Sequence, residues 1–60
     1  MKVWLSLQEI AEELEIPVSS IYHYRRMGMG PKCYQFGKHV RVHIHDFIQW
    51  KEENQIINHI

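Results

Sequence analysis

The stretch LSLQEIAEELEIPVSSIYHYRRMG, residues 5–28, holds two short helix patterns separated by a proline. Ser6 is followed three residues later by Glu9, a capping box in which each side chain satisfies a free backbone amide of the first helical turn. The apolar residues then follow helical spacing: Leu7, Ile10, Ala11 and Leu14. Pro17 cannot continue a helix, and it disfavours helical angles at the preceding residue. We therefore predict a first helix that begins at Ser6 and ends by about Glu15.

A second helix follows the proline almost at once. The run VSSIYHYRRM predicts a helix from Val18 to about Met27, and Gly28 ends it because glycine adopts positive φ angles without strain. Only about three residues connect the two helices, and so short a connection forces them to cross at a steep angle. The stretch therefore predicts a helix-turn-helix.

The second helix has an inward and an outward side. Ile21, Tyr24 and the stem of Arg25 lie on the inward side, with Val18 at its start. The outward side carries polar side chains at helical spacing: Ser19, Tyr22, His23 and Arg26. Hydroxyl, imidazole and guanidinium groups suit the base edges and phosphate oxygens of a DNA groove. An ordinary solvated helix face is the alternative, and Tyr22 and Tyr24 could exchange sides.

Two strand patterns follow, KCYQF at residues 32–36 and HVRVH at residues 39–43. A two-residue turn would place the valines and the aromatic residues on opposite faces, whereas a three-residue loop gathers them on one face. We predict the three-residue loop, Gly37 to His39, with Lys38 and His39 at an exposed tip. The expected opposing pairs are Phe36 with Val40 and Tyr34 with Val42. Phe36 and both valines would then anchor the hairpin to the core.

A third helix is expected from about Ile44 into the region of Asn54. Its apolar positions are Phe47, Ile48 and Trp50, and Asp46 near its amino end suits the helix dipole. Trp50 is expected in the core because a tryptophan buries a large area and few other residues here can supply it.

Two apolar features near the ends of the chain each have two interpretations. Trp4 either joins the core or forms an exposed flap. The tail QIINHI, residues 55–60, either packs on the core or provides an apolar edge for a second protomer or another protein.

The composition favours a binding module over an enzyme. A chain of 60 residues is expected to form one domain, residues 1–60, with a small core. Hydrophobic residues make up 45%, which suffices for folding, but so short a chain leaves little room for an elaborate catalytic pocket. Its single cysteine, Cys33, excludes an internal disulfide. Because neither an apolar leader nor a membrane-length segment is evident, we expect a cytoplasmic protein.

The charges are unevenly distributed although the formal net charge is zero. Between Ile16 and His45 there is no Asp or Glu. The same window contains five cationic side chains: Arg25, Arg26, Lys32, Lys38 and Arg41. Such a distribution can create a positive face on a neutral protein, with ordinary solvated side chains as an equal alternative.

Short motifs accompany the order helix, tight turn, helix, hairpin, helix. They are LQEIAEEL, SSIYHY, a GP pair before an aromatic strand, FGKHVRV, and a last helix that reaches Trp50. Through them, residues 5–52 resemble the excisionase-like, MerR-type winged-helix family of small DNA-binding proteins. The resemblance implies an α+β, mainly α fold: a winged helix-turn-helix whose second helix recognises DNA and whose hairpin is the wing. Glu15 and Pro17 depart from the family pattern, which often has glycine in the turn and Ser or Thr as the cap.

The resemblance also implies which residues contact DNA. In that family the recognition helix enters the major groove, and the wing lies along the phosphate backbone or in the minor groove. The matching recognition-helix positions are Ser19, Ser20, Tyr22, His23, Arg25 and Arg26. The matching wing positions are Lys38, His39 and Arg41. No catalytic residue, metal or cofactor is expected.

A winged helix of this size resembles a recombination directionality factor. Such an excisionase binds repeated sites beside the attachment site of a phage or mobile element, bends the DNA and directs integrase towards excision. The implied partners are double-stranded DNA, integrase and neighbouring copies of the chain, without a membrane or a small-molecule ligand. The protein would associate with the nucleoid when bound to DNA.

Other functions remain as alternatives. A small transcriptional regulator would use the same fold on DNA, and a protein-protein adaptor would use it without DNA. A metal site would draw on Cys33, His39, His43 and His45, but these lack the paired spacing of structural zinc sites. An enzyme is disfavoured because the sequence shows no carboxylate pair, no nucleophile with a base and no phosphate-binding glycine loop.

Overall fold

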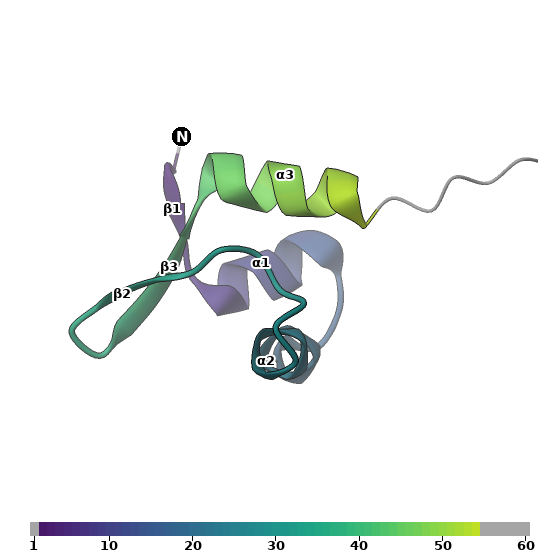
Figure 1. Ribbon diagram of the computed structural model, residues 1–60, viewed down its shortest axis with the longest axis horizontal. Coiled ribbons are helices and arrows are strands. Elements are labelled where there is room, and N and C mark those ends of the chain that lie inside the picture. The colour runs from purple at the N-terminus through teal and green to yellow at the C-terminus, as the bar shows by residue number, and fades with distance from the viewer. Residues whose placement is uncertain (1, 55–60) are drawn as a thin grey trace, which may run out of the picture.

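The computed structural model describes residues 2–54, which form three helices and a small antiparallel sheet of three strands (Figure 1). The elements in chain order are β1 (Trp4–Leu5), α1 (Leu7–Leu14), α2 (Val18–Arg26), β2 (Tyr34–Phe36), β3 (His39–His43) and α3 (Ile44–Glu53). This mainly helical arrangement is a winged helix-turn-helix, as predicted. The short strand β1 was not predicted from the sequence.

The predicted capping box opens α1. The Glu9 backbone amide donates to the Ser6 hydroxyl at 3.0 Å, and the Ser6 amide donates to a Glu9 carboxylate oxygen at 2.9 Å. The ammonium of Lys2 binds the other carboxylate oxygen of Glu9. The start of the first helix is therefore fixed by three donors on one short segment.

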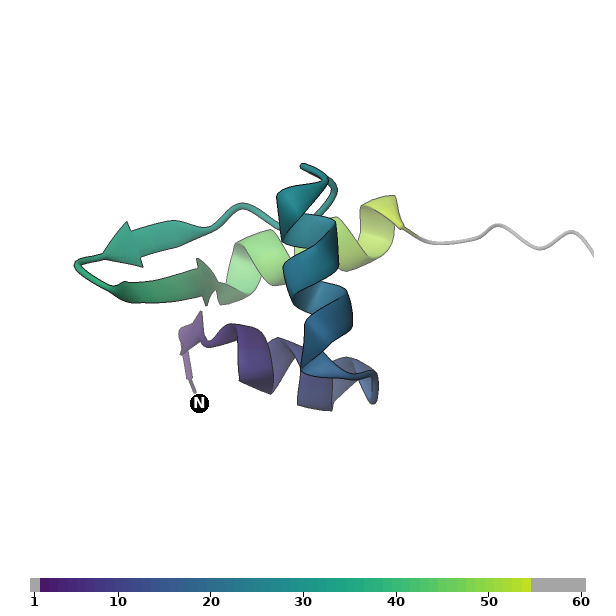
Figure 2. The same cartoon turned by 90° about the horizontal axis from the view of Figure 1, so that it is seen from below.

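Both helices of the helix-turn-helix end in the same pattern of hydrogen bonds. The Ile16 amide donates to the Ala11 carbonyl at 3.0 Å, and the Met29 amide donates to the Tyr24 carbonyl at 2.9 Å. In each case the intervening chain takes one left-handed residue, Glu15 with φ 57° or Gly28 with φ 71°. The tight turn at residues 15–17 makes α2 cross α1 steeply (Figure 2).

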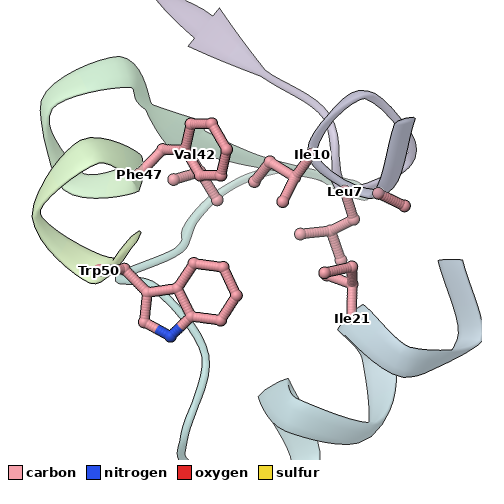
Figure 3. Packing of buried hydrophobic residues seen from close by; sticks show 7 residues of the cluster. Leu7, Ile10, Ile21, Val42, Phe47 and Trp50 are labelled. Carbon is pink, nitrogen blue, oxygen red and sulfur yellow. The ribbon is translucent and has the colours of Figure 1, made fainter. Parts of the chain in front are cut away.

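The core lies where the helices meet the sheet. Its buried side chains come from all three helices and β3: Leu7, Ile10, Ala11, Ile21, Val42, Phe47 and Trp50 (Figure 3). Trp50 lies in the core as predicted. Its indole nitrogen donates to the Met29 carbonyl at 2.8 Å, which ties the loop after α2 to α3.

The hairpin register differs from the prediction. Phe36 opposes His39, Gln35 opposes Val40 and Tyr34 opposes Arg41. The connection is therefore a two-residue turn of Gly37 and Lys38, and the predicted three-residue loop is wrong. Gly37 has a φ of 64° at the first turn position, where a type II′ turn requires glycine.

The register differs because Trp4 of β1 gives the outer face of the sheet an apolar residue of its own. β1 pairs with β3, with Trp4 opposite His43. Because opposing residues share a face, Trp4, Tyr34, Phe36 and His43 gather on the outer face as the outer aromatic cluster, while Val42 enters the core. The expectation that Phe36 anchors the hairpin to the core is therefore wrong, since its side chain is 52% exposed. Trp4, for which a core position and an exposed flap were both possible interpretations, belongs to this partly exposed cluster.

The third helix matches the expected range. His43 is its N-cap, and its Nδ1 accepts a hydrogen bond from the His45 amide at 3.1 Å. Phe47 and Trp50 are buried, whereas Ile48 is largely exposed. Both interpretations of the tail concern residues 55–60, which lie outside the described residues. Among residues 2–54, no helix has the length and apolar character needed to cross a membrane.

Glu15→Gly should stabilise the protein because Glu15 holds a left-handed conformation that glycine adopts without strain. We expect a gain of about 0.5–1 kcal/mol, or roughly 2–8 °C in Tm, by thermal unfolding. Glu13→Gly is the matched control, since it removes the same charge inside α1 and should cost about 1 kcal/mol. Equal losses from both changes would show that Glu15 carries no strain.

The Glu9 carboxyl should titrate far below its ordinary range. Its hydrogen bonds with the Lys2 ammonium and the Ser6 backbone lower the pKa of Glu9 from 4.5 to about 2. The folded state therefore binds fewer protons than the unfolded state, so this contribution to stability is complete above about pH 4.5 and is lost as the pH falls towards 2. Lys2→Met should raise the pKa in a carboxyl NMR titration, and Lys51→Met should leave it unchanged. An unchanged pKa in Lys2→Met would contradict the role of Lys2.

Candidate nucleic-acid interface

The outward side of α2 is a continuous polar surface. Ser19, Tyr22, His23 and Arg26 are all exposed, and Ser20 is half-buried. On the opposite side Ile21 is buried, and Val18 and Tyr24 pack against the core. The sequence prediction of an outward Tyr22 and an inward Tyr24 is confirmed. The α2 helix thus presents hydroxyl, imidazole and guanidinium groups on a rigid element.

Arg25 stands at the edge of this surface. Its side chain is exposed, in contrast to the inward stem expected from spacing. It lies near the Cys33 thiol, and the loop after α2 passes close to the helix here, since a Cβ added at Gly30 would lie 3.4 Å from the Arg25 backbone. Arg25 is therefore positioned beside the loop, away from the centre of the polar surface.

The wing presents its cations at the turn and along β3. Lys38 and His39 are exposed at the tip, as predicted. Arg41 is half-buried, and its Nη1 donates to the Val40 carbonyl at 2.8 Å. The amide of Gln35 donates to the Gly37 carbonyl at 3.0 Å and braces the turn.

A shallow groove lies between the wing and α2. It has a volume of about 220 Å³ and is lined by Ser6, Leu7, Gln8, Tyr22, Lys38, His39, Val40 and Arg41. The structure therefore brings together Tyr22 of α2 and all three predicted wing residues. Ser19, Ser20, His23 and Arg26 lie on the same helix as Tyr22 but do not line this groove.

The groove also has contributors that the sequence prediction missed. Ser6 and Gln8 belong to the amino end of α1 and were interpreted only as cap and solvated face. They reach the wing because β1 pairs with β3 immediately before α1 begins. A two-residue strand leaves no periodic signal in a sequence, so only the apolar run before Ser6 hinted at it.

Among the described residues, no acidic side chain lines this groove. Glu9 is engaged by Lys2, and Glu12 accepts a hydrogen bond at 3.4 Å from Nε2 of Gln8 at the edge of the groove. Residues 17–45, which include α2 and the wing, contain no acid. The neutral total charge therefore conceals a segment whose charged side chains are all cationic.

The residues suggested for a metal site are not assembled into one. No three His, Cys, Asp or Glu side chains between residues 2 and 54 are placed to hold an ion. Burial raises the pKa of the Cys33 thiol, which donates to the Pro31 carbonyl at 3.3 Å. His43 already uses Nδ1 to cap α3. Cys33 and His43 therefore have structural partners in place of a common ligand.

Two steeply crossed helices with a hairpin beside the second define a class of DNA-binding domain. Residues 4–55 match the family model of the helix-turn-helix domain. The chain therefore belongs to the helix-turn-helix domain family, and its fold is one of sequence-specific DNA binding. No curated protein matches the chain significantly.

Proposed function

We propose that the protein is an excisionase that binds duplex DNA through the outward side of α2 and the wing. The observation that carries this proposal is the shared groove, because it places Tyr22 of the recognition helix beside Lys38 and Arg41 of the wing. One surface can then meet a DNA groove and the adjoining phosphate backbone together. Residues 1–60 would act as one binding unit.

The recognition helix supplies the sequence-reading groups. Arg26 at the end of α2 can pair with guanine or a phosphate, and Ser19 near its start can pair with a base or a phosphate. Tyr22 and His23, which lie between Ser19 and Arg26 on the helix, can donate to oxygens of the DNA backbone. Ser20 and Arg25 flank this row, Ser20 half-buried and Arg25 beside the loop, so they would make peripheral contacts.

The wing supplies phosphate contacts. Lys38 lies in the two-residue turn, His39 follows it as the first residue of β3, and Arg41 lies two residues further along β3. If all five cations of the acid-free segment met phosphates, the logarithm of affinity would fall with the logarithm of salt concentration at a slope of about −4.5. One such module binds weakly, which favours repeated sites and neighbouring copies on DNA.

The excisionase role is supported by the family and by the motifs. The helix-turn-helix family includes excisionase-like DNA-binding proteins, and residues 5–52 resemble them in the order and spacing of their motifs. The function would be architectural, because bending of the attachment DNA and contact with integrase require surfaces and charges without a reacting group.

Arg26→Ala should weaken DNA binding and reduce discrimination between the target and unrelated duplexes, because a base-reading contact is worth about 1–3 kcal/mol. Lys38→Ala should weaken binding to all duplexes alike and reduce the salt slope by about 1. Lys51→Ala is the control, since that lysine lies on α3 over the Phe47 ring. Gel shifts at several salt concentrations make the measurement, and unchanged affinity in both test variants would overturn this interface.

The excisionase role can be tested with attachment-site DNA and the integrase of the same element. We expect a footprint over repeated sites, a bend in circular-permutation gels, and more excision when the protein is added. Arg26→Ala should lose footprint and excision together. Binding that represses a nearby promoter without promoting excision would instead identify a transcriptional regulator, and no shift of any duplex at low salt would identify an adaptor.

A further inference from the structure

The outer aromatic cluster is a second organised surface, distinct from the groove beside α2. The Trp4 ring lies 5.3 Å from Tyr34, 5.4 Å from Phe36 and 5.0 Å from His43, each time nearly perpendicular to its neighbour. These edge-to-face contacts draw on all three strands of the sheet. The rings are therefore held in fixed positions before any partner arrives.

The cluster remains open to solvent. Trp4 is 41% exposed and Phe36 is 52% exposed, although the core nearby is closely filled. Packing of the rings on one another explains the strand register, but it leaves a large aromatic area facing water. Rigid, partly exposed aromatic side chains are the groups that carry most binding energy at protein interfaces.

The charge around the cluster limits what could cover it. The Lys32 ammonium lies 5.2 Å from the centre of the Tyr34 ring, and residues 32–45 contain six Lys, Arg or His side chains, three of them in β3, but no acid. The nearest acid along the chain is Asp46, in the first turn of α3, where it lines a shallow pocket together with Lys32. A segment that brings carboxylates beside apolar side chains would complement both features.

The ring geometry favours a polypeptide over a nucleic-acid strand. Bases stack on free, flat ring faces, but Trp4 lies across both Tyr34 and Phe36, and Lys32 covers Tyr34. A second copy is a poorer fit through α1, since the exposed side of α1 offers carboxylates without a large exposed apolar residue. On α3 one exposed apolar residue, Ile48, lies one helical turn from Glu52, which gives a single such pair on a helix and not an alternating extended segment. These observations favour a segment of another protein.

We propose that the outer aromatic cluster docks a partner protein through an extended segment in which carboxylates alternate with apolar side chains. The interaction goes beyond the proposed DNA contacts, because its rings belong to the outer face of the sheet and none of them is assigned to DNA. His39 and Arg41 of the wing oppose Phe36 and Tyr34, so peptide binding is measured without DNA and its failure is told apart from a failure of DNA binding.

The test uses the ¹⁵N-labelled full chain and a short synthetic peptide in which Glu or Asp alternates with Leu or Phe. Two control peptides replace each acid by Lys or each apolar residue by Ser. Trp4 and Trp50 provide separate indole resonances, one in the cluster and one in the core. We expect the acidic peptide to shift the Trp4 resonance and to bind about tenfold more tightly than either control.

Two variants locate the binding site. Phe36→Thr should weaken peptide binding about tenfold, and Lys32→Gln, which keeps all the rings, should weaken it severalfold. Met27→Gln is the matched control, because Met27 is 60% exposed at the end of α2, and it should bind normally. An unshifted Trp50 resonance in each variant reports an intact core, and Arg26→Ala, which lies on α2 away from the sheet, should bind the peptide normally.

Several results would overturn the proposal. The Trp4 resonance could stay unmoved by the acidic peptide, or the Lys peptide could bind equally well. A stronger shift with single-stranded oligothymidine would assign the cluster to nucleic acid. Self-association that depends on Phe36, seen by sedimentation without any peptide, would assign it to a second copy.

Discussion

The burial of Val42 is the interaction on which the rest of the structure depends. Val42 lies in the central strand of the sheet, fully enclosed by the core that the three helices provide. Among the described residues of the wing, Val42 alone has a side chain with no exposed surface. Val40, two residues earlier, is only partly buried. The position of the wing relative to α2 is therefore set by one aliphatic side chain and its neighbours. A core this small has little redundancy, because removal of one buried side chain leaves a cavity that the few others cannot fill.

The amino-terminal half of the fold could be predicted because its signals are local. Ser6 and Glu9 fix the start of α1, Pro17 separates the helices, and Gly28 ends α2, each through the backbone of neighbouring residues. The sides of α2 followed from helical spacing for the same reason. For the candidate interface, helical spacing and the turn residues were enough to predict the exposed face of α2 and the exposed tip of the wing.

The hairpin register could not be predicted because its determinant is distant in sequence. The prediction assumed one apolar face, and on that assumption Phe36 and the valines belong together. Trp4 lies about thirty residues earlier and supplies a second apolar face, so the two-residue turn satisfies both sets of side chains. The groove escaped prediction for a related reason, since Gln8 and Lys38 become neighbours only through the pairing of β1 with β3.

The two faces of the hairpin are under different structural constraints. Side chains alternate strictly along a strand, so Val40 and Val42 are constrained by the interior while Tyr34 and Phe36 are not. Substitutions at Tyr34 and Phe36 can change what the outer face contacts without disturbing the packing of the hairpin on the core. The two faces of one hairpin can thus diverge at different rates, because only the inner face is constrained by the packing of the core.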